Sequence, residues 1–393
     1  MKDFIYEGNV KVIYGACQMD HVVEEIAKLG KKLLIVTTSS FVSGGHFEVL
    51  NNKLQNAGIT THCMSNIKLP LLSKVNEGIA ICQNEQIEAV LGIGGGVCLD
   101  LAKAIAFGAV NTETPMEKYL TYQASTEGLS HLSVVTIPTN PMSGSETNPD
   151  IQITFDENGL QAGCTVGHAA FTWLNPEYVR SLPNHILAYG QMTVFAQLSC
   201  NYLNLSRSPL AEHYAEASIK TVLECLRNSL SDANDLDARG TLMLNSALSL
   251  SGINDLGREI EFVPYPLQSF AQRYLGLQYP QTMTVIFPYW MKAIYRASED
   301  KEIFYRYFKE VLDLSVEGKD DEVLLQEALA TVFALYREFG IPTCWKELAQ
   351  DPKDHQKLVE IIDSFGPMPC KIMPATTEKL AEIIEDAIVG NVK

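Results

Sequence analysis

The sequence predicts an α/β domain followed by an all-helical domain, and three observations support this prediction. Short apolar runs alternate with helical patterns up to Leu182-Pro183. Strand patterns fade after that point, and long amphipathic segments take their place. A run of three glycines separates one apolar run from the helix that follows it. Such alternation is typical of a mostly parallel sheet with helices on both faces. We therefore expect an α/β domain at residues 1–182 and a helical domain at residues 183–393.

The individual elements follow in order along the chain. Buried strands are predicted at residues 32–37, 58–63, 89–93 and 132–137, with helices at 47–57, 72–84 and 98–107 between them. Long helices are predicted at 211–230, 237–250 and 323–339. Pro183 is placed near the start of the first helix of the second domain, where proline is tolerated. Ligands of parallel sheets bind at the carboxyl ends of the strands, so those ends are where a site is expected.

Composition narrows the class of protein. A length of 393 residues suits two domains, and a net charge of −17 argues against nucleic acid and against an anionic membrane surface as partners. The nine cysteines are scattered and form no C-x-x-C pair, which indicates that they are reduced thiols. We see no signal peptide and no apolar stretch long enough to span a membrane, and we expect a cytoplasmic protein.

The first candidate site is the glycine run. Gly94, Gly95 and Gly96 follow the apolar run at residues 89–93 and open the next helix. A strand, a glycine turn and a helix N-terminus can hold a diphosphate on backbone N–H groups. Asp100 and Lys103 lie one turn apart on that helix, so they share a face. The alternatives are a tight turn with no ligand and a solvated ion pair.

A second loop leaves the strand at residues 132–137. It carries the hydroxyl side chains of Thr136, Thr139, Ser143 and Ser145 around Gly144, and these suit phosphate or ribose contacts. The alternative is an ordinary polar loop in which Asn140-Pro141 starts a turn.

Together these segments resemble the iron-containing alcohol dehydrogenase family. Its fingerprint G-G-G-S-x-x-D-x-A-K is present with Val97 in place of serine, and its T-I-P-T…G-S-E motif is matched at residues 136–139 and 144–146. Residues 174–178 and 181–183 match the stretch that enters the family's helical domain. Residues 287–292 and 339–342 resemble the butanol-dehydrogenase-like branch. The resemblance implies a dehydroquinate-synthase-like architecture and a homodimer or larger assembly.

The same resemblance implies a metal site that this chain does not keep. The family holds a divalent metal with one aspartate and three histidines, and these positions correspond to Thr193, Gln197, Tyr265 and Tyr279. A further active-site histidine of the family corresponds to Ser269. No histidine occurs between His213 and His355, and the nearest carboxylates are Glu259 and Glu261. Because Fe²⁺ and Zn²⁺ prefer imidazole and carboxylate ligands, we expect no bound metal.

Two hypotheses of different classes follow. The first is an NAD(P)-dependent alcohol dehydrogenase or aldehyde reductase that works without metal on a small alcohol or aldehyde. Tyr265 or Tyr279 would then donate a phenolic proton, with Lys103 lowering its pKa. The second is a catalytically lapsed relative that binds a nucleotide or a protein partner, in which the two tyrosines fill the space that the metal site has left.

The cofactor expected under either hypothesis is a nicotinamide dinucleotide, with its ribose near Thr38 and Ser40. The family's NAD-preferring members carry aspartate at the position of Thr38, and a carboxylate there repels a 2′-phosphate. Hydroxyl groups do not, so NADP is slightly favoured over NAD, although no arginine stands nearby to bind the phosphate. The expected cofactor-binding residues are Gly94, Gly95, Gly96, Asp100, Lys103, Thr38, Ser40, Thr136, Thr139, Ser143 and Ser145.

Overall fold

The computed structural model describes residues 2–4, 6–259, 261, 263–366, 368 and 370–393. The chain forms two compact units. The α/β unit contains Glu7–Leu182 and Asn228–Ser251, and the helical unit contains Met1–Tyr6, Pro183–Arg227 and Gly252–Lys393. Each unit is described separately below.

The α/β unit is built on a six-stranded parallel sheet in the order β1-β8-β5-β4-β2-β3. Its strands are β1 (Lys11–Tyr14), β2 (Lys32–Thr37), β3 (Thr60–Met64), β4 (Ala89–Gly94), β5 (Ser133–Pro138) and β8 (Phe171–Leu174). A separate antiparallel hairpin consists of β6 (Asp150–Thr154) and β7 (Gln161–Thr165). The parallel sheet confirms the predicted fold class, and four of its six strands, β2, β3, β4 and β5, are those that the apolar runs predicted.

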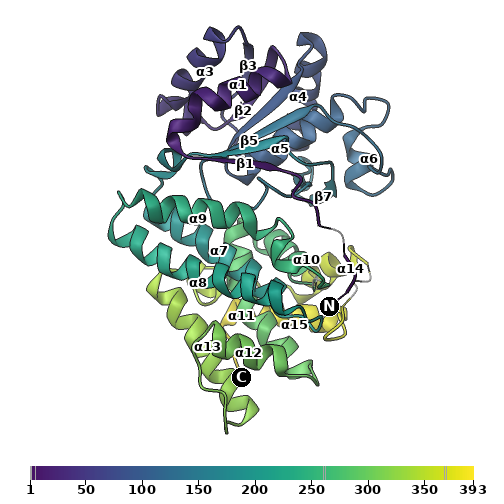
Figure 1. Cartoon of the computed structure of the whole chain (residues 1–393). Coiled ribbons are helices and arrows are strands. Elements are labelled where there is room, and N and C mark those ends of the chain that lie inside the picture. Colours follow the sequence, from purple (N-terminus) through teal and green to yellow (C-terminus); the bar gives the residue numbers. More distant parts are fainter. Residues whose placement is uncertain (1, 5, 260, 262, 367, 369) are drawn as a thin grey trace. The chain divides into compact units, whose positions relative to one another are not determined.

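Helices cover both faces of this sheet, as Figure 1 shows. Leu33 and Ile35 of β2 pack with α1 (Met19–Leu29) and α3 (His46–Asn56) on one face. Leu34 and Val36 of the same strand pack with α4 (Leu72–Glu85) and α5 (Gly96–Gly108) on the other. A strand with apolar residues on both sides is what a sheet covered on both faces requires. The remaining helices of this unit are α2 (Ser39–Ser43), α6 (Met116–Leu120), α9 (Leu236–Ser249) and two short 3₁₀ turns, Ala16–Gln18 and Pro176–Val179.

The helical unit has α7 (Asn184–Tyr202) and α11 (Tyr279–Ala297) at its centre, and the two pack against each other. Phe195 of α7 meets Phe287 of α11 edge to face, and the Tyr336 hydroxyl donates a hydrogen bond of 2.5 Å to the carbonyl of Thr284. Pro183 directly precedes α7, as predicted. The other elements are α8 (Pro209–Ser231), which continues into the α/β unit, η3 (Ile253–Asp255), α10 (Pro264–Leu275), α12 (Glu302–Glu310), α13 (Asp321–Glu338), η4 (Trp345–Leu348), α14 (His355–Asp363) and α15 (Thr377–Val389).

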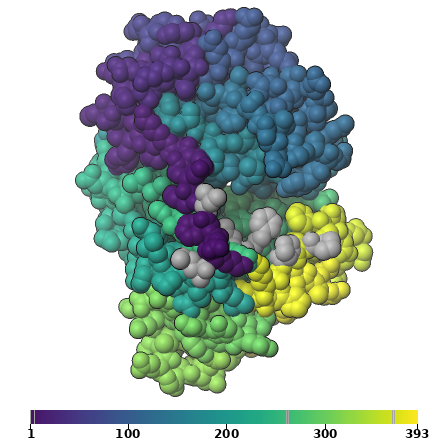
Figure 2. Space-filling view, turned by 45° about the vertical axis from the view of Figure 1, so that its right-hand side comes forward, coloured from purple at the N-terminus to yellow at the C-terminus, as the bar shows by residue number. Residues whose placement is uncertain are grey.

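Each unit combines segments that are separated in the sequence, whereas we predicted two contiguous domains that meet at residue 182. Helix α9 belongs to the α/β unit because the buried guanidinium of Arg239 donates hydrogen bonds to the carbonyls of Val179, Arg180 and Leu182. Near the N-terminus of the sequence, the backbone N–H of Lys2 donates a hydrogen bond to the carbonyl of Gly257 in the helical unit. In Figure 2 these first residues, in purple, lie beside the yellow C-terminal part of that unit. Long-range polar contacts of this kind leave no local sequence pattern.

The structure also contains elements that the sequence patterns did not predict. Strands β1 and β8 have four residues each, and the β6–β7 hairpin includes Gly163, which has poor strand propensity. Within the described part of the chain, no helix has the length and apolar character needed to cross a lipid bilayer.

Candidate functional site: a glycine turn and a separate polar cluster

The glycine turn lies at the carboxyl end of β4, in the middle of the parallel sheet. Gly94 ends β4, Gly95 is the N-cap residue of α5, and Gly96 is its first residue, so the helix begins two residues before the predicted start. Among the described residues no side chain caps this end of α5, and its first turn carries no acidic residue. The first N–H groups of a helix attract anions, so this end of α5 is suited to a diphosphate.

Because the glycines of this turn have no side chains, neighbouring atoms approach its backbone closely at two positions. A Cβ atom on Gly96 would lie 2.7 Å from the Cβ of Ser143, which is closer than real carbon atoms approach. Gly94 has φ +154°, and a Cβ there would meet the Cys98 sulfur at 2.7 Å and the Thr38 Cγ2 atom at 3.3 Å. The turn therefore brings together the ends of β2 and β4 and the loop that follows β5.

That loop is joined to α5 by direct hydrogen bonds. The Thr139 N–H donates to the carbonyl of Gly94 over 2.9 Å. The Ser145 hydroxyl donates to one Asp100 carboxylate oxygen over 2.5 Å, and the Gln152 N–H donates to the other over 3.1 Å. Asp100 thus holds the second loop in place from the side of the helix.

Lys103 acts on the same loop. Its ammonium is buried and donates to the carbonyl oxygens of Ser145, Asn148 and Asp150 at 3.2, 3.2 and 2.5 Å, and it lies 3.6 Å from Asp100. The shared face predicted for Asp100 and Lys103 therefore exists, but Lys103 is buried and Asp100 is only 17% exposed, so the pair is not solvated. Burial lowers the pKa of Lys103 and raises that of Asp100, and each group's charge opposes the shift of the other. These contacts give Lys103 the role of supporting the loop.

The other predicted cofactor residues fall into two groups. Thr38 caps α2 by accepting from the Phe41 N–H over 3.3 Å, and its hydroxyl lies 3.0 Å from that of Ser40. Both stand at the end of β2, beside the glycine turn. Thr136 is fully buried, and its hydroxyl donates to the Glu146 carbonyl over 3.4 Å, so this side chain contributes to the fold of the loop.

Two buried polar atoms beside the turn have no hydrogen-bond partner among the described residues. They are the Thr37 hydroxyl, at the last position of β2, and the Asn140 side-chain oxygen. The Asn140 Cβ atom lies 3.7 Å from where a Cβ of Gly95 would stand. Buried polar atoms are nearly always hydrogen-bonded, so these two atoms favour a polar ligand at this place. Thr37 and Asn140 were not predicted as site residues, because the lack of a partner becomes visible only in three dimensions.

Glu146 is a further buried acid in the same loop, with 1% of its surface exposed. Burial raises the pKa of its carboxyl to about 7, and the charge of Lys103 opposes the increase. The loop therefore holds a carboxyl group that titrates near neutral pH.

The helical unit contains a second polar arrangement, at the four positions that the sequence resemblance assigns to the family's metal ligands. The Gln197 Nε2 atom donates to the Tyr279 hydroxyl over 3.0 Å, which joins α7 to the start of α11. The Thr193 hydroxyl lies 3.3 Å from that of Thr284 on α11 and donates to the Tyr189 carbonyl. We call Thr193, Gln197, Tyr265 and Tyr279 the polar cluster.

Tyr265 and Ser269 enter this region from α10. The Tyr265 hydroxyl donates to the Asn201 side-chain oxygen over 2.9 Å. Burial raises the pKa of Tyr265 well above its usual value, and Tyr279, Cys200 and Asp255 raise it further. Gln268 donates to the Ser269 hydroxyl and accepts from the Thr282 hydroxyl.

The side chains of the polar cluster do not suit a transition metal. They offer a hydroxyl, an amide and two phenols, which are weak ligands for Fe²⁺ or Zn²⁺. Across the described residues, no group of three or more histidine, cysteine, aspartate or glutamate side chains is placed to hold a metal ion. The donor set therefore disagrees with a metal of the kind that the family binds.

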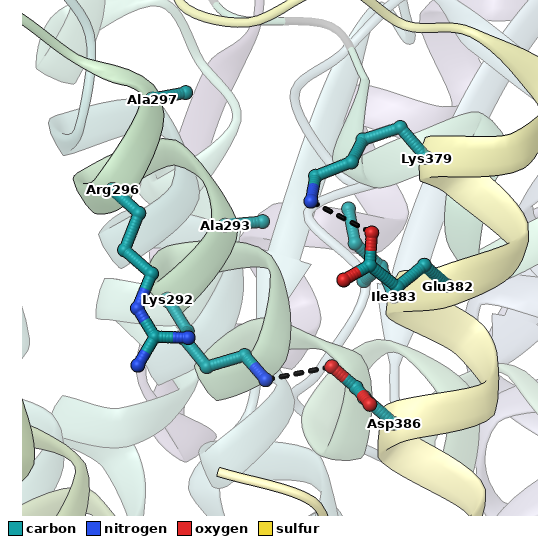
Figure 3. Close-up of a pocket in the computed structure, with 8 residues that line it drawn as sticks. All are labelled: Lys292, Ala293, Arg296, Ala297, Lys379, Glu382, Ile383 and Asp386. Carbon is teal, nitrogen blue, oxygen red and sulfur yellow. Dashed lines mark hydrogen bonds and ion pairs between the residues drawn. The ribbon is translucent and has the colours of Figure 1, made fainter. Parts of the chain in front are cut away.

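Two cavities in the helical unit lie apart from the residues described so far. One, of about 250 Å³, lies between α11 and α15, and Figure 3 shows its charged walls. Lys292 pairs there with Asp386, and Lys379 pairs with Glu382. The other, of about 280 Å³, is lined by Lys2, Glu259, Glu261 and Lys371 among others. The cations of both cavities are paired with carboxylates, so neither cavity presents an uncompensated charge.

Comparison with protein families covers most of the chain. A family described as iron-containing alcohol dehydrogenase matches residues 9–172. The C-terminal domain of the Fe-containing alcohol dehydrogenase family matches residues 187–388.

Curated relatives and solved structures agree with these matches. A probable NADH-dependent butanol dehydrogenase 2 of Bacillus subtilis is 25% identical over 87% of this chain and 88% of its own length. An NADPH-dependent aldehyde reductase of Escherichia coli is 22% identical over 76% of each chain. The crystal structure of an NADH-dependent butanol dehydrogenase A from Thermotoga maritima superposes with a TM-score of 0.91, covers 99% of both chains and is 24% identical, which shows a shared fold.

Proposed function

The chain belongs to the iron-containing alcohol dehydrogenase family, and we propose that it is a nicotinamide-nucleotide-dependent oxidoreductase acting on a small alcohol or aldehyde without a bound metal. The observation that carries the proposal is the glycine turn. It combines an uncapped helix N-terminus, two close approaches that require glycine, and unpartnered buried atoms of Thr37 and Asn140. Relatives named for NADH-dependent and NADPH-dependent reactions support a nicotinamide nucleotide as the ligand.

Different residues of the α/β unit would bind different parts of the nucleotide. The N–H groups at the start of α5 would hold the diphosphate, and Thr37, Thr38 and Ser40 would contact the ribose at the end of β2. Asp100 and Lys103 would keep the second loop beside the turn. When bound, the nucleotide supplies or accepts the hydride. Without a carboxylate at Thr38, NADP is slightly favoured over NAD.

A phenol of the polar cluster would supply the proton that a substrate oxygen needs. Removal of a Lewis acid costs several kcal/mol of transition-state stabilisation, so a phenol in its place would give a slow enzyme. Tyr265 and Tyr279 are the candidates, and a neutral phenol is maintained because the pKa of Tyr265 is raised. Lys103 is not proposed as a catalytic group, because backbone carbonyls hold its ammonium.

A second candidate is a lapsed relative that binds the nucleotide but catalyses no reaction. The observation that favours it is the direct hydrogen bond between two members of the polar cluster, from the Gln197 amide nitrogen to the Tyr279 hydroxyl. Two measurements separate the candidates. Fluorescence titration of chelator-treated protein with NADH and NADPH tests binding. Consumption of either nucleotide with short-chain aldehydes, in the presence of chelator, tests hydride transfer.

The expected result is micromolar binding of at least one nucleotide and slow turnover that chelator does not reduce. Binding without turnover above the uncatalysed rate would favour the lapsed relative. No binding of either nucleotide at millimolar concentration would exclude the oxidoreductase and leave the glycine turn as a structural feature of a lapsed relative that binds no nucleotide.

A further inference from the structure

A hydrogen-bonded chain of three side chains leads from the polar cluster to a buried carboxylate. The Tyr265 hydroxyl on α10 donates to the Asn201 Oδ1 atom on α7 over 2.9 Å. The Asn201 Nδ2 atom donates to the Asp255 Oδ2 atom, at the end of η3, over 3.4 Å. The chain connects three elements of the helical unit, and neither Asn201 nor Asp255 corresponds to a predicted site residue.

The chemistry of these groups fixes the direction of each hydrogen bond. An ionised carboxylate only accepts, so the Asn201 atom that faces Asp255 must be the amide nitrogen. The amide oxygen of Asn201 then faces Tyr265, and the phenol has to donate to it. The hydroxyl hydrogen of Tyr265 therefore points to Asn201.

Tyr279 has the opposite arrangement. The Gln197 amide nitrogen is a donor only, so the Tyr279 oxygen accepts in that contact. The O–H of Tyr279 is then directed elsewhere. The hydroxyl hydrogen of Tyr279 therefore takes no part in its contact with Gln197, whereas the hydroxyl hydrogen of Tyr265 is donated to Asn201.

We propose that Asp255 is a positioning residue that sets the hydrogen-bond direction of the Tyr265 hydroxyl through Asn201. The catalytic meaning of this inference rests on the proposed function: Tyr265 could donate to a substrate oxygen only when its hydroxyl hydrogen is not held by Asn201. If Asp255 takes up one proton, its carboxyl can donate to Asn201 Oδ1. The amide then turns over, its nitrogen donates to Tyr265, and the Tyr265 hydroxyl rotates to donate elsewhere. No other proton changes its residue.

The surroundings of Asp255 allow its carboxyl group to take up this proton at a mildly acidic pH. Its second oxygen, Oδ1, is buried and has no hydrogen-bond partner among the described residues. Burial raises the pKa of Asp255 to about 6, although the charge of Arg258 and the hydrogen bond from Asn201 lower it. Tyr265 faces Asp255 from α10, and Arg258 is in turn influenced by Glu212 and Tyr202.

The test is a ¹³C NMR titration of protein labelled at the ζ carbon of tyrosine, from pH 5 to pH 8. This carbon carries the hydroxyl and reports whether the phenol donates or accepts. The Tyr265 signal is assigned by its loss in Tyr265→Phe. We expect one step in this signal near pH 6 in the wild type. Asp255→Asn should abolish the step, and the control Asp351→Asn, at an exposed position, should leave it unchanged.

If Asp255→Asn does not fold, Asn201→Leu breaks the same link and should also abolish the step. A Tyr265 signal that does not move with pH in the wild type, or a step that persists in Asp255→Asn or Asn201→Leu, would overturn the inference. The titration needs no turnover, so its result is independent of the proposed function. Where turnover is measured, kcat should show the same step in the wild type and lose it in Asp255→Asn, while nucleotide affinity stays constant.

Discussion

The amide nitrogen of Gln197 donates a hydrogen bond of 3.0 Å to the hydroxyl of Tyr279. The two residues are far apart in the sequence, on α7 and at the start of α11. The family resemblance predicts that both stand at positions where the family carries a histidine that binds metal. Their contact shows that a neutral donor and a neutral acceptor are paired here.

The first prediction concerns these positions. The variant Thr193→Asp/Gln197→His/Tyr265→His/Tyr279→His should bind about one equivalent of Zn²⁺ or Fe²⁺, because it restores one carboxylate and three imidazoles. The wild type should bind none tightly. Elemental analysis after gel filtration measures both proteins. One equivalent of tightly held metal in the wild type would contradict the metal-free proposal, and a metal-free variant would contradict the register.

The second prediction concerns the glycine turn. Gly96→Ala should weaken the binding of NADH and NADPH at least tenfold, or about 1.4 kcal/mol, because the new methyl group displaces Ser143 and its loop. Gly8→Ala is the matched control, since nothing lies within 4 Å of a Cβ at that position. Fluorescence titration gives both affinities. Equal affinities of Gly96→Ala and the wild type would show that the turn does not contact the nucleotide.

The fold was predictable to the extent that it follows from local patterns. The runs at residues 33–36 and 89–93 contain no polar side chain because both faces of those strands are buried, and this produces a strong signal. Strand β1 is short and lies at the edge of the sheet, so its four residues produce almost no recognisable sequence pattern. The membership of α9 in the α/β unit depends on Arg239, whose hydrogen bonds reach carbonyls about 60 residues earlier in the chain.

The candidate site was predictable in position but not in its detail. Glycine and hydroxyl residues at strand ends indicate a ligand whatever their partners are. The partners decide the role of each side chain, and Lys103 illustrates this. Its spacing from Asp100 indicated a shared helix face, but only the fold shows that three carbonyl groups of another loop surround its ammonium. Asn201 and Asp255 carry no motif, so their connection to Tyr265 required the structure.

The third prediction concerns Lys103. Lys103→Met should lower the free energy of unfolding by about 3 kcal/mol, because it leaves the carboxylate of Asp100, which is 17% exposed, without its buried cation. Lys74→Met, at an exposed position, should change it little. Urea unfolding followed by circular dichroism measures both variants. A stability loss no greater than that of Lys74→Met would show that the buried contacts of Lys103 do not support the loop.

The fourth prediction concerns pH. The pKa of Glu146 is about 7 in the folded protein, against an unfolded value of 4.5. A raised pKa means that the folded state holds the proton more tightly, so this contribution is complete below pH 4.5 and is lost as pH rises through 7. The full loss is about 3 kcal/mol. Wild-type stability should therefore fall relative to Glu146→Gln between pH 5 and pH 8. The exposed Glu157→Gln serves as control, and parallel stability curves for wild type and Glu146→Gln would refute the prediction.

The last prediction concerns the choice of nucleotide. Thr38 caps α2 by accepting from the Phe41 N–H, and aspartate caps helices equally well, so Thr38→Asp should fold. The new carboxylate would stand at the end of β2, where it repels a 2′-phosphate and accepts from a ribose hydroxyl. We expect NADPH affinity to fall at least tenfold and NADH affinity to stay equal or rise. Paired titrations of both nucleotides measure this. Ser43→Asp adds the same charge at the other end of α2 and should change neither affinity, which separates a local contact from a general effect of charge. If Thr38→Asp and Ser43→Asp behave alike, the ribose does not lie beside Thr38.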